Sequence, residues 1–137
     1  MLTLHAPIRV YVMDMDEASA HDEIILDEMG DYSDLIGTDR FVILPCTIGG
    51  RAFNVAKSAE DYGFMPVSSA SSDGVPQTYG NVLILGYTED GHRGLTQEEV
   101  VHIERHVTMT IRFSKSMSTH YVINDMNVTG VEYDDDD

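Results

Sequence analysis

The 137-residue sequence is poor in basic residues: it has eight Lys and Arg but 24 Asp and Glu, a formal net charge of −16. Proteins that bind nucleic acid use Lys and Arg to displace counterions from phosphates, and anionic membrane surfaces attract proteins through the same side chains. Direct binding to nucleic acid or to a membrane is therefore disfavoured. The charge is instead suited to a basic protein partner.

Cysteine and long apolar runs are also scarce. The single cysteine, Cys46, cannot form an internal disulfide, which is typical of a reducing compartment. The longest apolar run, residues 41–46, is far short of the ~20 residues that span a bilayer. Residues 1–7 have neither the basic start nor the apolar segment of a signal peptide. We expect a protein of the host-cell cytoplasm in which Cys46 is a buried apolar residue rather than a nucleophile.

The remaining composition is that of a globular domain. Apolar residues make up 42% of the chain, and its length is sufficient for one hydrophobic core. We expect a single α+β domain over residues 1–131, with a small mixed or mostly antiparallel sheet and one or two packed helices. Residues 132–137 are expected to form an acidic C-terminal tail.

The negative charge is concentrated in two places. Residues 14–34 include no Lys or Arg and nine acids, namely Asp14, Asp16, Glu17, Asp22, Glu23, Asp27, Glu28, Asp31 and Asp34. The last six residues add Glu132 and four Asp. The stretch between these regions is nearly neutral. Two acidic regions therefore flank a fairly balanced domain.

Periodicity and turn residues predict most of the regular elements. Alternation predicts strands at residues 8–13 and 107–113, and short apolar runs between turn residues predict strands at 40–46, 51–56, 67–71 and 81–86. Residues 47–50 should close a hairpin, because Gly49 and Gly50 can supply the positive φ angles of a tight turn. Residues 71–80 are predicted to be a loop. Residues 120–124 and 127–132 are predicted to pair as a C-terminal hairpin.

One helix has a clear start, because Thr96 and Glu99 match the capping-box pattern. This helix should continue to about His106, with Val100, Ile103 and Val107 on its buried side.

The acid-rich region has two interpretations. Apolar residues at helical spacing (Ile25, Met29, Tyr32, Ile36) favour a helix. The alternative is a short strand at 23–26 followed by one or two helical turns ending at Gly37. We favour the second interpretation, because Gly30 and like charges four residues apart disfavour a continuous helix.

Four segments resemble a known family. They are Asp34–Gly37, Ile48–Asn54, Gly80–Gly86 and Leu95–His106. By their order and spacing, residues from about 30 to 107 resemble DUF3846, a family of unknown function found in phages and mobile elements. The sequence departs from the family pattern in its acid-rich N-terminal region and in the extension after Val107. The resemblance implies a phage or mobile-element origin and a fold type, but no activity and no site residues.

The candidate chemical sites are few. His102 and His106 have the i, i+4 spacing of a zinc-ligand pair, but they lie beside the core stripe, so a solvated helix face is preferred and no metal site is expected. The turn from Gly91 to Gly94 contains Arg93 and is a candidate anion site or simply a polar turn. Residues from Asp14 onward do not match a calcium-binding loop. Since no nucleophile, phosphate-loop or dinucleotide motif occurs, we expect no enzymatic activity and no cofactor.

These observations favour a non-enzymatic phage or mobile-element accessory protein that binds a basic host or phage protein through acidic patches. Such a protein could act as a nucleic-acid mimic or inhibit host defence, since clustered carboxylates resemble a row of phosphates. The predicted partner-binding residues are Asp22, Glu23, Asp27, Glu28, Asp31 and Asp34. One alternative is that the acids only confer solubility. Another is a small-molecule, nucleotide-type binding domain that uses loops 72–80 and 87–94.

Overall fold

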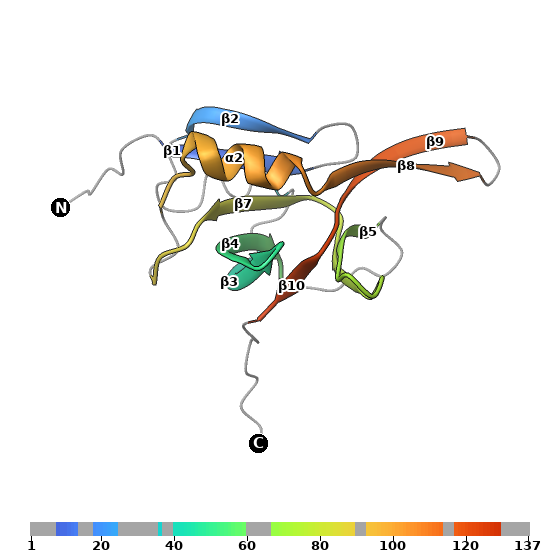
Figure 1. Cartoon of the computed structure of the whole chain (residues 1–137), viewed down its shortest axis with the longest axis horizontal. Helices are drawn as coiled ribbons and strands as arrows, with labels where there is room; N and C mark the ends of the chain where they lie inside the picture. The colour runs from blue at the N-terminus through green and yellow to red at the C-terminus, as the bar shows by residue number, and fades with distance from the viewer. Residues whose placement is uncertain are drawn as a thin grey trace, which may run out of the picture.

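A computed structural model describes residues 8–13, 18–24, 36, 40–59, 67–89, 93–113 and 117–129. For residues 19–24, 110–113 and 117–120 it describes the backbone alone. The described chain forms two sheets and the helix α2 (Gln97–Glu104), so it is mostly antiparallel β structure with a single short helix (Figure 1). No helix among these residues is long and apolar enough to cross a membrane.

The larger sheet has six strands, and every neighbouring pair in it is antiparallel. In spatial order they are β10 (Met126–Val128), β3 (Phe41–Ile48), β4 (Arg51–Ser58), β7 (Val82–Gly86), β1 (Ile8–Met13) and β2 (Ala18–Ile24). Strands β7 and β1 are neighbours in this sheet although they are far apart in sequence. The strands predicted at 8–13 and 81–86 are thereby confirmed.

The hairpin of β3 and β4 is also confirmed, and both strands are longer than the sequence predicted. Ile48 pairs with Arg51, and the turn between them has φ angles of +57° at Gly49 and +83° at Gly50. These left-handed values are the ones that glycine adopts without steric cost. The turn therefore fixes the register of the whole hairpin.

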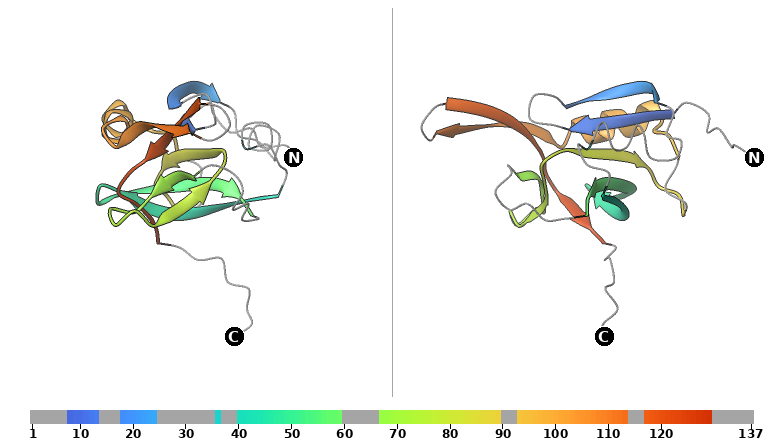
Figure 2. Two further views of the ribbon diagram at one scale, coloured as in Figure 1. Left: turned by 90° about the vertical axis from the view of Figure 1, so that its right-hand side faces the viewer. Right: turned by 180° about the vertical axis from the view of Figure 1, so that it is seen from behind.

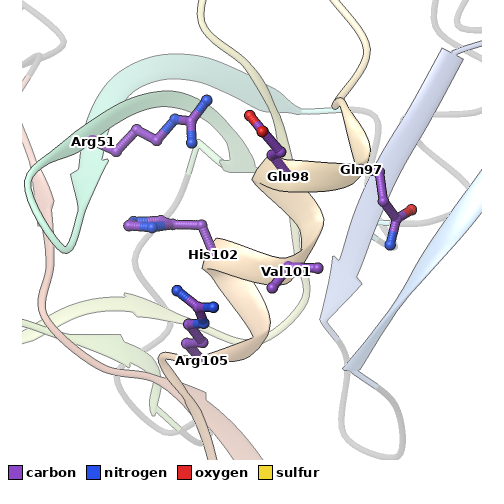
Figure 3. A pocket seen from close by; sticks show the side chains of 6 residues that line it. All are labelled: Arg51, Gln97, Glu98, Val101, His102 and Arg105. Atoms are coloured by element: carbon purple, nitrogen blue, oxygen red, sulfur yellow. The ribbon is translucent and has the colours of Figure 1, made fainter.

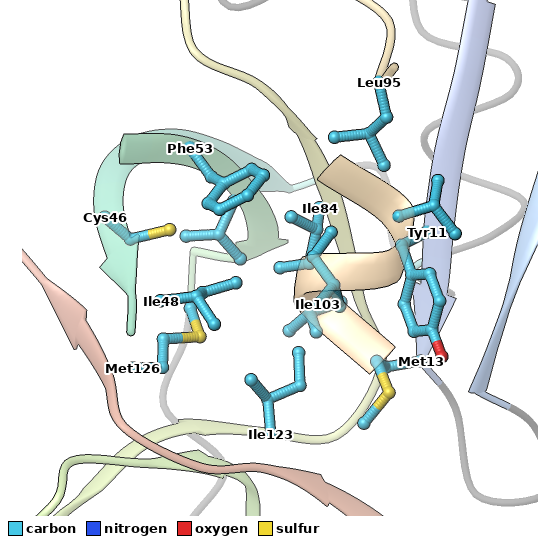
Figure 4. Close-up of a cluster of buried hydrophobic side chains, with 13 residues drawn as sticks. Tyr11, Met13, Cys46, Ile48, Phe53, Ile84, Leu95, Ile103, Ile123 and Met126 are labelled. Carbon is cyan, nitrogen blue, oxygen red and sulfur yellow. The ribbon is translucent and has the colours of Figure 1, made fainter. Parts of the chain in front are cut away.

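The central strands are buried on both faces of this sheet. On β7, Val82 and Ile84 belong to one apolar cluster, while Leu83 and Leu85 belong to the other. The first cluster lies between the sheet and α2, which contributes Val100 and Ile103 (Figure 4). Each fully buried side chain of this kind stabilises the fold by about 1.5–3 kcal/mol. The sheet is therefore the middle layer of the described core.

Cys46 belongs to the cluster beneath α2, and only 1% of its surface is exposed. Burial raises the pKa of its thiol to about 12. The prediction that Cys46 is a buried apolar residue is confirmed, since a thiol that stays protonated is a poor nucleophile.

A smaller sheet has the order β6 (Pro76–Tyr79), β5 (Val67–Ala70), β9 (Met117–Ile123) and β8 (Val107–Phe113). Its β8–β9 hairpin projects away from the larger sheet in Figure 1 and in the right-hand view of Figure 2. The strands predicted at 67–71 and 107–113 are confirmed. Val107 begins β8 rather than ending the helix, so its prediction as a helical core residue was wrong.

Two other predictions were wrong. Residues 76–79 of the predicted loop form β6, whose Thr78 is buried and shares hydrogen bonds with the hydroxyls of Ser68 and Ser69 at 2.7 and 2.6 Å. The last two strands do not form a hairpin: β9 pairs with β8 and β5, whereas β10 pairs with β3 in the larger sheet. The chain changes sheets at Asp125, whose φ angle is +58°.

The acid-rich region contains β2, which starts at Ala18, five residues before the predicted strand. Pairing with β1 determines this start, because Met13 lies opposite Ala18. Ile25, Met29 and Tyr32 of the helical alternative lie outside the described residues. Ile36 is described and is buried on the side of the sheet opposite α2.

The two glycines of the hairpin turn offer a matched test of packing. A Cβ atom at Gly49 would lie 2.6 Å from the His106 ring, whereas one at Gly50 would meet nothing within 4 Å. Both replacements by alanine share a left-handed backbone cost of about 1 kcal/mol. We expect Gly49→Ala to lower the free energy of unfolding by a further ~1–3 kcal/mol through overpacking. Denaturant unfolding of both variants measures the difference, and equal losses would contradict the described packing.

Candidate functional site

Helix α2 begins with the predicted capping box. The Thr96 hydroxyl accepts a hydrogen bond from the Glu99 N–H at 3.1 Å, and the Glu99 carboxylate accepts one from the Thr96 N–H at 2.8 Å. These bonds satisfy two backbone donors that a helix start otherwise leaves unpaired. The start of α2 is therefore determined locally by its own residues.

Glu99 also has a role that the sequence did not reveal. Its side chain is 5% exposed, and its two carboxylate oxygens accept hydrogen bonds from Arg93 at 3.2 and 2.7 Å. Arg51, the first residue of β4, lies 3.8 Å from the same carboxylate. Burial by itself would raise the pKa of Glu99, but the Arg93 and Thr96 hydrogen bonds and both arginine charges outweigh it, so the pKa is lowered.

Arg93 is consequently a structural residue, which weakens the candidate anion site in the Gly91–Gly94 turn. Its guanidinium also donates to the carbonyl oxygens of Tyr87 and Gly94 at 3.0 and 3.1 Å. Its backbone carbonyl accepts from the Gly86 N–H at 2.9 Å, which ties the segment before α2 to the end of β7. An anion would have to compete with these partners. Gly91 and His92 lie outside the described residues.

His102 of α2 and His106, which follows the end of the helix, do not form the solvated face that we predicted. Both are half-buried over the β3–β4 turn. His102 Nε2 lies 2.6 Å from the Ile48 carbonyl oxygen, so it must donate to that oxygen, and the ring stacks on Phe53 with centroids 5.9 Å apart. His106 Nδ1 lies 3.0 Å from the His102 carbonyl oxygen and likewise donates. The first of these bonds joins α2 to the hairpin, whereas the second joins His106 to the last turn of the helix.

Among the described residues, no three His, Cys, Asp or Glu side chains gather closely enough to hold a metal ion. The rings of His102 and His106 lie over the β3–β4 turn with their centroids 5.0 Å apart.

A pocket of about 380 Å³ lies along the outer side of α2 (Figure 3). We name it the α2 pocket; its lining residues are Arg51, Gln97, Glu98, Val101, His102 and Arg105. In Figure 3 the side chains of Arg51, His102 and Arg105 lie on one side of the helix and Gln97 on the other. The side-chain oxygen Oε1 of Gln97 accepts a hydrogen bond from Arg9 Nη1 at 2.9 Å.

The predicted partner-binding acids are only partly described. Asp22 and Glu23 lie on β2, which is the last strand of the larger sheet. The other four, Asp27, Glu28, Asp31 and Asp34, lie outside the described residues. The structure therefore brings two of the six onto one strand edge. The acidic tail at 132–137 also lies outside the described residues.

The loops suggested for a small molecule are described in part. Within 72–80 the chain forms β6, as described above. Near 87–94, the buried Asn54 side chain donates to the Thr88 carbonyl oxygen at 2.9 Å, and Arg93 binds the Tyr87 carbonyl oxygen. The Asn54 bond joins the second segment to β4, and the Thr78 bonds join the first segment to β5.

Comparison with known proteins gives no guide to the function of these surfaces. No family model, curated protein or solved structure matches the chain. The resemblance to the DUF3846 family therefore stays a prediction.

The network around Glu99 can be tested by stability against pH. A lowered carboxylate pKa stabilises the fold above the group's ordinary pKa of 4.5, and this contribution disappears as pH falls through the lowered value. At neutral pH we expect Glu99→Gln to lower the free energy of unfolding by about 2 kcal/mol, because it weakens a cap and a nearly buried ion pair. The deficit should shrink in acid. Denaturant unfolding measured across pH checks this expectation.

The matched control is Glu98→Gln, which removes the neighbouring, exposed carboxylate. It should change stability by under ~0.5 kcal/mol at either pH. A Glu99→Gln deficit that stays constant from neutral to acid pH would show that the charge of Glu99 is not the stabilising element.

Proposed function

We propose that this protein is a non-enzymatic accessory protein that binds a basic protein partner through its acidic edge strand, β2. The observation that carries the proposal is the position of Asp22 and Glu23 on the outermost strand of the larger sheet. The origin in a phage or mobile element rests on the sequence resemblance alone.

The geometry of β2 favours pairing with an added strand. Over residues 18–24 it pairs with β1, and no other strand of the described chain pairs with its outer edge. An edge of this kind presents backbone N–H and C=O groups that an extended segment of a partner can bind. Seven residues are long enough for several such bonds.

The charge of β2 favours one kind of partner. Strand β2 lies within residues 14–34, which include nine acids and no Lys or Arg. Two copies of the protein would oppose like charges at this edge, which disfavours self-pairing. A segment rich in Lys and Arg would instead gain attraction at long range and faster association. Host or phage surfaces that bind nucleic-acid phosphates have this composition, so the edge could act as a nucleic-acid mimic.

Charge reversal on β2 tests the proposal. We expect Asp22→Lys with Glu23→Lys to weaken binding of an arginine-rich peptide at least tenfold, because two attractions become repulsions. Wild-type binding should weaken steeply with added salt, and the variant should lose most of this dependence. Fluorescence anisotropy of the labelled peptide over a salt series gives both quantities.

The control reverses two acids elsewhere by the same total charge. Asp73 and Glu89 are exposed and lie outside β2, so Asp73→Lys with Glu89→Lys keeps the β2 edge intact. This control should retain most of the affinity. If both double variants lose affinity equally, net charge alone attracts the peptide and β2 is not the docking strand.

A further inference from the structure

The α2 pocket has a charge opposite to that of the protein as a whole. Two of the eight Lys and Arg residues, Arg51 and Arg105, line it, together with one acid, Glu98. Two arginines around one pocket give a local excess of positive charge in a chain whose net charge is −16. The pocket is therefore a place where the described surface can attract a small anion.

Arg51 is held in place by an interaction that leaves its N–H donors available to a ligand. Its guanidinium lies 3.8 Å from Glu99, which is beyond hydrogen-bond distance, while Arg93 occupies both oxygens of that carboxylate. The Arg51 side chain is 44% exposed. Attraction to Glu99 thus fixes the position of Arg51, and its N–H donors can bind a ligand.

Arg105 enters from the other end of the pocket, at the C-cap of α2 (Figure 3). Its backbone N–H donates to the Val101 carbonyl oxygen at 3.1 Å. Within the described part of the chain, its exposed guanidinium makes no hydrogen bond. Arg105 can therefore turn its donors toward a ligand at little cost.

The wall between the two arginines is rigid. His102 lies there, and its ring is held by the Ile48 carbonyl oxygen and by stacking on Phe53. Because this wall is fixed before binding, the site loses less conformational entropy when a ligand binds. The pocket also runs along the side of α2, so its charge comes from side chains rather than from the helix dipole.

We propose that the α2 pocket binds a phosphate-bearing small molecule of about nucleotide size, with its phosphate held by Arg51 and Arg105. Planar guanidinium groups match the oxygen spacing of phosphate and bind it through charge-assisted hydrogen bonds. A volume of about 380 Å³ exceeds that of a phosphate alone and lies in the usual range for small-molecule sites. Val101 gives the organic part an apolar surface, and Glu98 can accept from its hydroxyl or amino groups.

Titration calorimetry of the full chain with adenosine 5′-monophosphate, inorganic phosphate and adenosine tests this site. We expect the monophosphate to bind most tightly, phosphate more weakly, and adenosine without detectable heat. Arg105→Gln should weaken binding of the monophosphate about tenfold or more, since it removes a charged donor. Glu98→Gln should tighten binding of inorganic phosphate severalfold, because it removes a like charge.

The matched control is Arg40→Gln, which removes an exposed arginine at the opposite end of the β3–β4 hairpin and should leave affinity unchanged. Arg105→Gln breaks no described contact of the fold, and thermal unfolding without ligand verifies this. The proposal is overturned if neither phosphate compound binds at millimolar concentration, if adenosine binds as tightly as its monophosphate, or if Arg40→Gln and Arg105→Gln weaken binding equally. Each result is independent of the β2 docking proposal, because none of these residues lies on β2.

Discussion

The buried carboxylate of Glu99 interacts with three parts of the chain at once. It caps α2, accepts two hydrogen bonds from Arg93 in the segment after β7, and attracts Arg51 at the start of β4. A nearly buried charge is unfavourable unless it is paired and hydrogen-bonded. The ion pairs satisfy this requirement only when helix, segment and hairpin are all in place. The carboxylate therefore favours one arrangement of these elements over less specific packings.

The same interaction connects the core to the surface. Beneath Glu99, Val100 and Ile103 of α2 pack on the larger sheet, while above it Arg51 extends into the α2 pocket. His102 likewise has two roles, because it packs over the hairpin turn and also forms a wall of the pocket. The pocket is thus lined by side chains whose positions are already determined by the packing of α2. Such a site needs little reorganisation on binding.

The sequence predicted those elements whose cause is local. The capping box depends on Thr96 and Glu99, three residues apart, and the hairpin turn depends on the adjacent Gly49 and Gly50. Both were therefore visible without a structure. The resemblance to a family of unknown function added no site residue.

The missed features depend on contacts between distant parts of the chain. Strands β9 and β10 lie in different sheets because β10 pairs with the edge of β3. The α2 pocket forms because Arg51 lies beside a helix that begins at Gln97. No spacing rule reports such contacts. The histidines show the same limit. Their i, i+4 spacing is compatible with a solvated face, a metal site or a packing contact, and it does not report their contact with the distant hairpin turn.

The pairing of β10 with β3 has a consequence for the order of folding. Met126 lies opposite Ile48, so the outer edge of β3 acquires its partner only after nearly all of the described chain has been synthesised. Strand β1 likewise cannot pair with β7 until that strand has been synthesised. Closing such long loops slows folding, because chain entropy is lost before the distant contacts compensate for it. The β3–β4 hairpin can form early because its turn is local. During translation, the apolar outer edge of β3 would therefore stay unpaired and exposed until β10 has been synthesised.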